Sequence, residues 1–315
     1  TMQNLGDLAA FIAGKIGLSD TASLTKIKSF ATQRYASIYA GALWKDALTI
    51  LTRNVAASEP IVILPAHIAH FVAAKFDATG LIPIDQSFLF ASNPTLWEDS
   101  GTPTHCSELA PSASKLMPAA AGELLSLRSS QAGDTGLVSL FGEDANGDPQ
   151  QEIVTLNGTN KVATVNAYAI LYTFSKGATQ GTITLKDNVG INGTTTYSTL
   201  LPTETQRLHR RVRLHQIPSS ALTLLILAKR HPGPFTQDTD ATNLPTLCDQ
   251  GLQAMVHGDA LEWMQQYGKA QGKFAEGLRL LADAKKSEAY QASQNIRMTP
   301  GDGIAEGCSE ADFLN

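Results

Sequence analysis

Charged residues and cysteines are both scarce in this sequence, and each shortage excludes a class of protein. Asp, Glu, Lys and Arg make up 17% of the 315 residues and hydrophobic residues 43%, which fits a globular chain of about two folding units. The three cysteines, Cys106, Cys248 and Cys308, lie far apart and form no CxxC pair. They fit neither a disulfide framework nor a structural zinc site, so we predict free thiols. Low charge also agrees with an oligomer, because subunit interfaces are depleted in Lys, Glu and Asp.

The chain also lacks long apolar runs and an excess of positive charge. No run approaches the roughly 20 apolar residues that cross a bilayer. The first residues, Thr1 to Asn4, do not have the basic and then apolar order of a signal peptide. The formal net charge of -5 argues against broad nucleic-acid affinity, which depends on clustered Lys and Arg. We therefore expect a protein made in a cytoplasm, without a membrane segment.

Catalytic and metal-binding patterns are missing too. No GxGxxG, Walker A, GxSxG or HExxH sequence is present. His67 and His70 could share a helix face, but no Cys, Asp or Glu stands near them at ligand spacing. His105 and Cys106 are adjacent and point in different directions, which disfavours a nucleophile pair. We predict no catalytic activity, no cofactor and no metal; an unrecognised enzyme site around His67, His105 and Cys106 is the alternative.

Three polar patterns in the middle of the chain favour turns. The stretch from Asp144 to Asp148 matches the opening of a calcium loop, but the twelfth position is Thr155 and not the required Glu. Its Asn-Gly pair is typical of a hairpin turn. Asn157–Thr159 and Asn192–Thr194 match glycosylation acceptors, and without a signal peptide we interpret them as turns.

Helical periodicity marks the two ends of the sequence. We expect a helix from about Leu5 to Ile16, then a longer one from about Thr21 to Ala56. Helical spacing returns from Leu247, with Gly268 and Gly272 as weak points. The chain thus opens and closes with helices.

Alternation of apolar and polar residues marks the middle of the sequence. Between Leu124 and Lys186 short alternating runs are separated by turn signals, which predicts a small β-sandwich or an immunoglobulin-like module. Two further strands, about Arg207 to His215 and Leu222 to Lys229, are expected to pair across the turn from Ile217 to Ser220.

The densest charge feature is the basic ribbon, the predicted strand from Arg207 to His215. Alternation places five basic side chains on one face of this strand. They are Arg207, His209, Arg211, Arg213 and His215. The face can be a solvated surface, a salt-bridging surface for an acidic neighbour, or a contact with nucleic acid.

The last segment, Thr299 to Asn315, reads as an acidic extended arm. An arm of this kind, supplied by an adjacent subunit, could pair with the basic ribbon. Its interface candidates are Asp302, Glu306, Glu310, Asp312 and Phe313.

Three stretches form an ordered pattern over about half of the chain. The first is the N-terminal helical hairpin with Trp44, Ile61–Pro65, Leu81–Asp85 and Gly101–Pro103; the second is Arg211–Pro218 with Leu222–Arg230; the third is Leu244-Pro245 ahead of Ala260–Ala270. In this order they resemble the head-to-tail adaptor, or neck, proteins of tailed bacteriophages.

The resemblance implies an α+β fold, in which a helical bundle of N- and C-terminal helices packs on a small sheet. The discontinuous adaptor core would be residues 1–123 and 198–298, the inserted antiparallel β-sandwich module 124–197, and the acidic arm 299–315. The β-module departs from the smallest members of that family.

The resemblance also implies a structural protein of the virion, assembled in the host cytoplasm. Copies would form a twelvefold ring that connects portal to tail and lines the DNA passage without binding DNA specifically. The implied partners are its own copies, the portal protein, a tail or stopper protein, and the capsid through the β-module. The alternative function is an oligomeric binding module whose β-insert recognises a glycan or a receptor.

Overall fold

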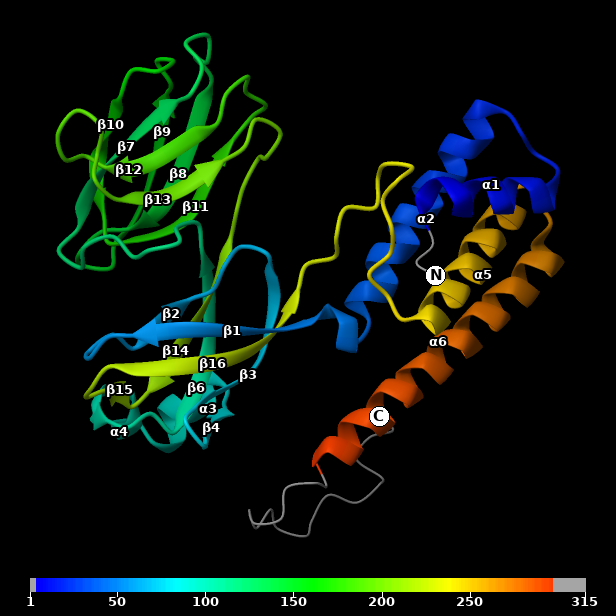
Figure 1. Ribbon diagram of the computed structural model, residues 1–315. Coiled ribbons are helices and arrows are strands. Elements are labelled where there is room, and N and C mark those ends of the chain that lie inside the picture. The colour runs from blue at the N-terminus through cyan, green and yellow to red at the C-terminus, as the bar shows by residue number, and fades with distance from the viewer. Residues whose placement is uncertain (1–3, 297–315) are drawn as a thin grey trace. The chain divides into compact units, whose positions relative to one another are not determined.

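The computed structural model describes residues 4–296, which divide into two compact units. One unit joins the two ends of the chain and is helical; the other, Leu48–His231, is rich in strands (Figure 1). The predicted fold class, an α+β helical bundle with a small sheet, is wrong. The described residues form 16 strands in four sheets, one of them nearly barrel-shaped, and six α-helices. The predicted boundaries near 123 and 197 both fall inside the β-rich unit.

Four helices of the helical unit share one apolar core. They are α1 (Leu5–Ile16), α2 (Thr21–Ala40), α5 (Thr246–Trp263) and α6 (Tyr267–Ile296). Asn4 caps α1 and Asp20 caps α2 by accepting hydrogen bonds from backbone N–H groups of the first turn. Gly17 ends α1 in the left-handed conformation, at φ 75°. The core side chains include Leu8, Ile12, Ile27, Tyr35, Trp44, Leu252 and Val256.

The two ends of the chain are also tied by polar contacts. The Arg34 guanidinium donates to both carboxylate oxygens of Asp259, at 2.7 and 2.6 Å. Lys28 pairs with Asp238 at 2.5 Å. Residues more than 200 positions apart in sequence are thereby held in one unit.

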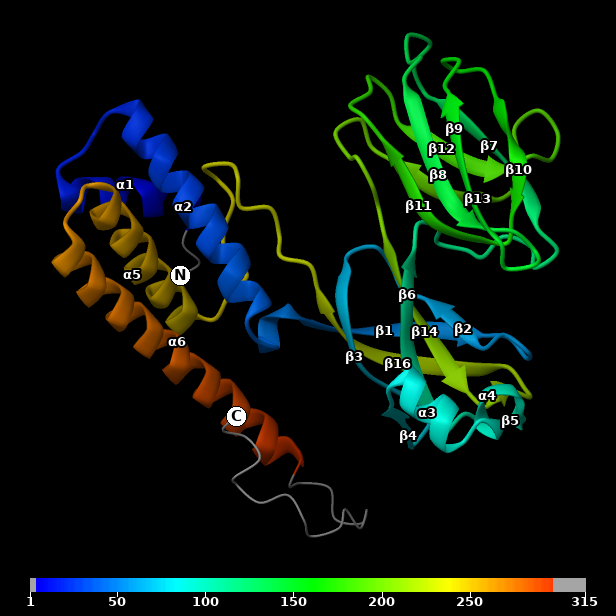
Figure 2. The same ribbon diagram turned by 180° about the vertical axis from the view of Figure 1, so that it is seen from behind.

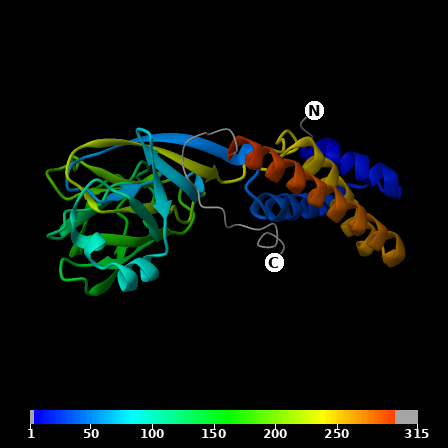
Figure 3. The same ribbon diagram turned by 90° about the horizontal axis from the view of Figure 1, so that it is seen from below.

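Helices α5 and α6 pack closely because glycines line their contact. Figure 3 shows α6, coloured orange to red, beside α5. A Cβ added at Gly258 would lie 2.6 Å from the Phe274 ring, and one at Gly277 would lie 2.7 Å from Met255. The turn between the helices falls at Gln265, at φ 60°, just before the predicted weak point Gly268. None of the described helices is long and apolar enough to cross a membrane.

The predicted helix from Thr21 to Ala56 is too long. α2 ends at Ala40, a 3-10 turn covers Lys45–Ala47, and β1 (Leu48–Val55) follows as a strand. Gly41 takes the C-cap position and breaks the helical run. Residues after it alternate in burial because β1 lies against β16.

A seven-stranded sheet forms one half of the β-rich unit, in the order β1-β16-β3-β4-β6-β14-β2 (Figure 2). Its other strands are β2 (Ile61–Ile63), β3 (Ile68–Phe76), β4 (Thr79–Pro83), β6 (His105–Ser112), β14 (His209–His215) and β16 (Leu222–Arg230). β14 pairs with β6 and β2, whereas β16 pairs with β1 and β3. The expectation that these two strands pair with each other is therefore wrong.

Two short helices and a two-stranded parallel sheet accompany the seven-stranded sheet. They are α3 (Gln86–Ser92), α4 (Thr95–Glu98), β5 (Ser100–Gly101) and β15 (Ile217–Pro218). The residues expected to form a turn between the two strands, Ile217–Ser220, instead include β15, which pairs with β5.

The alternating middle of the chain folds as two facing sheets, β10-β7-β12-β13 and β11-β8-β9 (Figure 1). Their strands are β7 (Glu123–Ser129), β8 (Leu137–Glu143), β9 (Pro149–Thr155), β10 (Val162–Tyr168), β11 (Ile170–Lys176), β12 (Ile183–Asp187) and β13 (Thr196–Leu200). Leu127, Leu140, Phe174 and Leu185 are among the side chains buried between them. The predicted Asn146-Gly147 turn joins β8 and β9, with Gly147 at φ 85°.

Two buried aspartates hold loops of this sandwich. Asp134 accepts hydrogen bonds from the Ser129 hydroxyl and from the backbone N–H groups of Gln180 and Gly181. Asp187 accepts from Thr194 and Thr195 in the loop that follows β12. Asp134 therefore joins two loops, whereas Asp187 fixes the loop that follows its own strand.

Candidate functional site

The basic ribbon lies on β14 except for Arg207, which precedes the strand, and most of it is covered. Among its five candidates, His209, Arg211 and His215 are buried, while Arg207 and Arg213 are partly buried. Val212 and Leu214 face the apolar core of the seven-stranded sheet. The alternation is thus present, but the basic face packs against other parts of the unit and is not a solvated surface.

Each arginine of the ribbon has a partner within the β-rich unit. Arg211 Nε donates to the Ala110 carbonyl at 2.7 Å, and its guanidinium lies 5.7 Å from the centre of the Tyr172 ring. Arg213 donates to the Trp97 carbonyl at 3.0 Å and lies 4.2 Å from the centre of the Trp97 ring.

The ends of the ribbon are held in the same manner. Arg207 pairs with Glu204 at 2.6 Å. The Nδ1 of His209 donates to the Leu64 carbonyl at 3.2 Å. Burial, together with the charges of Arg207 and Lys115, lowers the pKa of His209 below its usual value. The candidates of the arm, Asp302, Glu306, Glu310, Asp312 and Phe313, lie outside the described residues.

A buried Ser-His contact lies at the other end of β14. Ser107 Oγ lies 2.8 Å from His215 Nε2, but both residues are buried, and the Nδ1 of His215 has no hydrogen-bond partner among the described residues. Burial and the nearby Arg213 charge lower the pKa of His215 to about 4. Among residues 4–296 no carboxylate bonds to this histidine, so the pair is not completed to a catalytic triad.

The three residues of the alternative enzyme site do not converge on one cavity. Burial raises the pKa of the Cys106 thiol to about 12, and its side chain lies in the apolar core of the seven-stranded sheet. His105 contacts the Thr104 hydroxyl through Nδ1 at 2.9 Å. His67 lines a cavity that neither of the other two reaches. A protonated, enclosed thiol cannot act as a nucleophile.

No group of three or more potential metal ligands occurs within residues 4–296. The Asp144 carboxylate accepts hydrogen bonds from the backbone N–H groups of Asn146 and Asp148. These bonds, which depress the pKa of Asp144, shape the hairpin turn. The carboxylate that resembles a calcium ligand therefore stabilises the hairpin turn.

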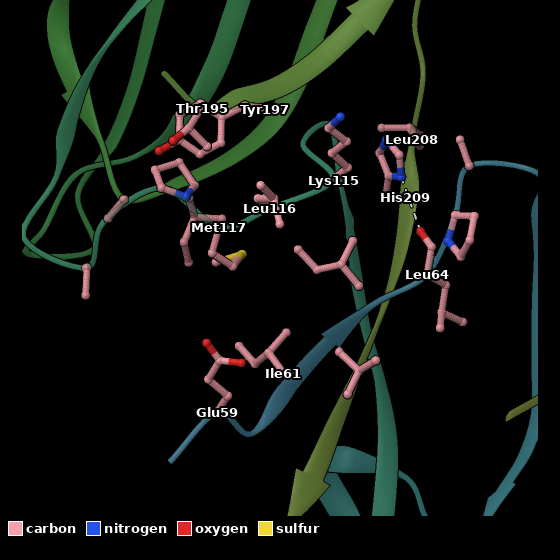
Figure 4. A pocket seen from close by; sticks show the side chains of 18 of the residues that line it. Glu59, Ile61, Leu64, Lys115, Leu116, Met117, Thr195, Tyr197, Leu208 and His209 are labelled. Carbon is pink, nitrogen blue, oxygen red and sulfur yellow. Dashed lines mark hydrogen bonds between the residues drawn. The ribbon is translucent and has the colours of Figure 1, made fainter. Parts of the chain in front are cut away.

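The β-rich unit contains a hollow of about 1810 Å³. Its wall includes β2, the segment Lys115–Pro118, the β8–β9 turn and Arg207–His209. Figure 4 shows Lys115, Leu116 and Met117 on one side of this hollow, with Glu59 and Ile61 across from them. The sequence did not predict that these wall residues meet, because they come from four separate segments and carry no shared motif.

The hollow contains the free edge of β2, the last strand of the seven-stranded sheet. Leu64 N donates to the Arg210 carbonyl at 2.8 Å, and Leu214 N donates to the Pro60 carbonyl at 2.7 Å. In an antiparallel ladder alternate residues bond to the same neighbour. The backbone N–H and C=O groups of Ile61 and Ile63 therefore point away from β14.

The hollow carries two basic side chains without a carboxylate partner in the described chain, Arg53 and Lys115. Four carboxylates line it as well. Glu204 pairs with Arg207, and Glu143 accepts from the Tyr172 hydroxyl at 2.8 Å. Glu59 is exposed, and Asp144 is held by the hairpin turn. The wall therefore carries no excess of positive charge.

A second candidate surface lies on α6, where an apolar stripe faces solvent. Tyr267 and Leu278 are each 59% exposed, and Ala275 and Ala282 are exposed beside them. Their spacing places them on one side of the helix, together with Gln271. A different side of α6 is buried against the core through Ala270, Leu281 and Ala284. We call Tyr267, Gln271, Ala275, Leu278 and Ala282 the α6 stripe.

Comparison with known proteins assigns neither surface a role. No protein-family model matches the chain, and no curated protein matches it significantly.

Proposed function

We propose that this chain is a structural subunit of a bacteriophage virion, in which copies form a ring that joins the portal to the tail and lines the DNA passage. The α6 stripe is the observation that carries the proposal. Together with the family resemblance of the ordered stretches, it favours an assembly subunit over a protein that works alone.

The α6 stripe has the character of a helix-helix contact. A helix that packs on one neighbour needs an apolar face roughly 100° wide. α6 extends its apolar sector beyond the side that meets the core, through Tyr267 and Leu278. Exposing two large side chains on one stripe costs free energy in water, which a second copy would recover by covering them.

The distribution of positive charge agrees with a passage that does not hold DNA. Four basic side chains of the ribbon are engaged with Ala110, Trp97, Glu204 and Leu64. They are not available to neutralise a row of phosphates, which non-specific DNA binding requires.

A binding role for the β-sandwich is the second candidate function. Leu137, Phe141 and Ile153 are exposed on the outward face of β8 and β9. Phe141 lies 6.1 Å from Tyr172, while Tyr168, Phe174 and Tyr197 are buried. This apolar face fits contact with another protein, such as a capsid or receptor protein, better than a glycan site, which would need several exposed aromatic rings.

Light scattering and negative-stain imaging of the purified chain, alone and mixed with a portal protein, test the adaptor role. We expect a ring, or a ring that forms on the portal. Leu278→Asp places a charge on the α6 stripe and should shift the protein toward monomers. Arg279→Asp, one position away and off the stripe, is the matched control and should assemble normally. A chain that stays monomeric and never joins a portal would contradict the proposal.

A further inference from the structure

Three Asn-Gly pairs stand in loops of the β-rich unit, and each carries the groups of a spontaneous reaction. They are Asn146-Gly147, Asn157-Gly158 and Asn192-Gly193. In such a pair the backbone nitrogen of glycine can attack the side-chain carbonyl carbon of asparagine, because glycine has no Cβ to hinder the approach. The attack needs room for the backbone to turn and a glycine nitrogen that gives up its own hydrogen bond. The structure around each pair therefore decides which pair reacts.

The Asn146-Gly147 pair meets both conditions. Its two residues are exposed at the turn between β8 and β9, and a Cβ added at Gly147 would have no described atom within 4 Å beyond its chain neighbours. Gly147 N donates to the Asp144 carbonyl at 3.2 Å, the longest of the bonds that the three glycine nitrogens make. The Asn146 side chain makes a long contact, 3.4 Å from its Nδ2 to Asp144 Oδ2. Its carbonyl carbon is thus open to attack.

The Asn157-Gly158 pair is held in place by its backbone. Gly158 is buried; its N–H donates to the Asp134 carbonyl at 2.8 Å, and its carbonyl accepts from Ser129 N at 2.9 Å. A Cβ added at Gly158 would collide with the Ala132 backbone, so the chain has no room to turn. The glycine nitrogen can reach the asparagine side chain only after this part of the fold opens locally.

The Asn192-Gly193 pair is held at both reacting groups. Gly193 N donates to the Val189 carbonyl at 3.0 Å. The side-chain carbonyl of Asn192 accepts a hydrogen bond from the Arg128 guanidinium, also at 3.0 Å. A Cβ added at Gly193 would lie 2.6 Å from Asp187 Oδ1, so this glycine is closely packed as well. Both hydrogen bonds must break before the two groups can meet.

We propose that Asn146 is a site of spontaneous deamidation and that the fold protects the other two pairs. Gly147 N loses its proton to hydroxide and forms a bond to Cγ of Asn146. The bond from Cγ to Nδ2 breaks, and the leaving nitrogen takes up a proton from water and departs as ammonia. The product is a five-membered succinimide ring. Water then adds to one of its two carbonyl carbons and opens that ring C–N bond, which leaves either aspartate or isoaspartate.

The reaction changes both the charge and the length of the turn. Each product carries a carboxylate between those of Asp144 and Asp148, and isoaspartate also adds a methylene group to the backbone. The turn lines the hollow, so the new negative charge falls on its wall. Deamidation thus gives the hollow a fifth carboxylate as the protein ages.

Peptide mass spectrometry of the full-length protein, incubated in mildly alkaline buffer, tests the assignment. We expect the amide-to-acid mass change to appear at Asn146 about tenfold faster than at Asn157 or Asn192, because opening two hydrogen bonds slows those sites by about this factor. In guanidinium chloride the fold no longer protects any pair, and the three rates should become similar. Equal rates in the folded protein, or a faster reaction at either of the other pairs, would overturn the proposal.

Asn146→Gln is the matched variant for the chemistry. It keeps the side-chain amide but lengthens the side chain by one methylene group, so the glycine nitrogen would have to close a larger ring and reacts slowly. The isoaspartate that forms in the folded protein should therefore disappear, while the circular dichroism spectrum stays native. Isoaspartate that accumulates at its former rate in this variant would place the reaction at another residue and refute the assignment.

Discussion

Arg211 shows how far the meaning of one residue depends on what covers it. It is 4% exposed, with its guanidinium over the Tyr172 ring and its Nε bonded to the Ala110 carbonyl. Burial lowers its pKa from the usual range, although the Tyr172 hydroxyl and Glu143 favour the charged form. The side chain is a structural contact inside the β-rich unit.

Arg211→Glu should therefore destabilise folding. The substitution buries a carboxylate beside a carbonyl oxygen and near Glu143, and should lower the free energy of unfolding by about 3–5 kcal/mol. Urea denaturation followed by circular dichroism measures the change. Arg128→Glu, at a more exposed arginine of the same unit, should cost less than about 1 kcal/mol. Equal stability of the two variants would contradict this role of Arg211.

Asp134 makes the stability of the β-rich unit depend on pH. The hydrogen bond from Ser129 and those from Gln180 and Gly181 depress the pKa of Asp134. A depressed carboxyl pKa stabilises the fold above the unfolded value of about 3.9, and this contribution is lost as the pH falls through the folded value.

Asp134→Asn should accordingly lower the Tm at pH 7, and the difference from the unaltered protein should shrink as the pH falls below about 4. Differential scanning calorimetry across this range gives the comparison. Asp148→Asn, whose carboxylate is exposed, should leave the Tm unchanged at both pH values. A constant Tm difference from pH 7 to pH 3 would show that Asp134 acts without its charge.

Alternation in the sequence predicts which residues share a face, but not whether that face meets water. Arg211, Arg213 and His215 were placed on one face of a strand, and the structure keeps them there. The covering groups, Tyr172 and Trp97, come from positions tens of residues away. No local signal identifies them, so an exposed ribbon and a covered one look the same in sequence.

At the scale of elements, the contact between α5 and α6 depends on where glycine stands. Gly277 lies under Met255 and near the Gly251 carbonyl, whereas Gly272 has no atoms within 4 Å of an added Cβ. Glycine costs a helix about 1 kcal/mol relative to alanine. Of these two glycines, Gly277 is the one at which close packing offsets that cost.

Gly272→Ala should raise the free energy of unfolding by about 1 kcal/mol. Gly277→Ala should forfeit this gain, because the added methyl group overpacks the contact at a cost of about 1–3 kcal/mol. Chemical denaturation monitored at 222 nm distinguishes the two variants. Equal stabilisation by both alanines would mean that α5 and α6 are not closely packed at Gly277.

Element boundaries could be predicted where a cap marks them. The helix from Leu5 to Ile16 is found as predicted, since Gly17 ends it. The helix beginning at Thr21 was extended too far because Leu48 and Leu51 continue its spacing by chance, whereas β16 imposes a strand there. Spacing alone cannot separate a helix from a strand whose partner lies far along the chain.

For the whole molecule, the sequence predicts helical ends and a β-rich middle but not how much of the chain forms strands. A mixed apolar pattern through Phe76, broken afterwards by prolines at 83, 94 and 103, predicts only a strand or short helix and then a surface loop, so the seven-stranded sheet was missed. Long-range pairing such as β1 with β16 and β6 with β14 has no local signature. The hollow was missed for the same reason, since it exists only after these strands meet.

The β-rich unit should fold by itself. Its first strand begins at Leu48, which pairs with Lys229 near the end of its last strand, so both junctions lie together. A fragment of residues 48–231 should give a cooperative thermal transition and a β-type circular dichroism spectrum. Gradual unfolding of a soluble fragment, or a fragment without a β spectrum, would show that the helical unit is needed.

The neighbouring junctions at Leu48 and Lys229 also have a mechanical consequence. A pull applied to the β-rich unit through both junctions draws β1 and β16 in the same direction, so the ladder between them is not sheared. The tension passes to the next ladder, between β16 and β3, whose register shifts at two places. The two linkers therefore carry the force in parallel, and β16 would separate from β3 before β1 separates from β16.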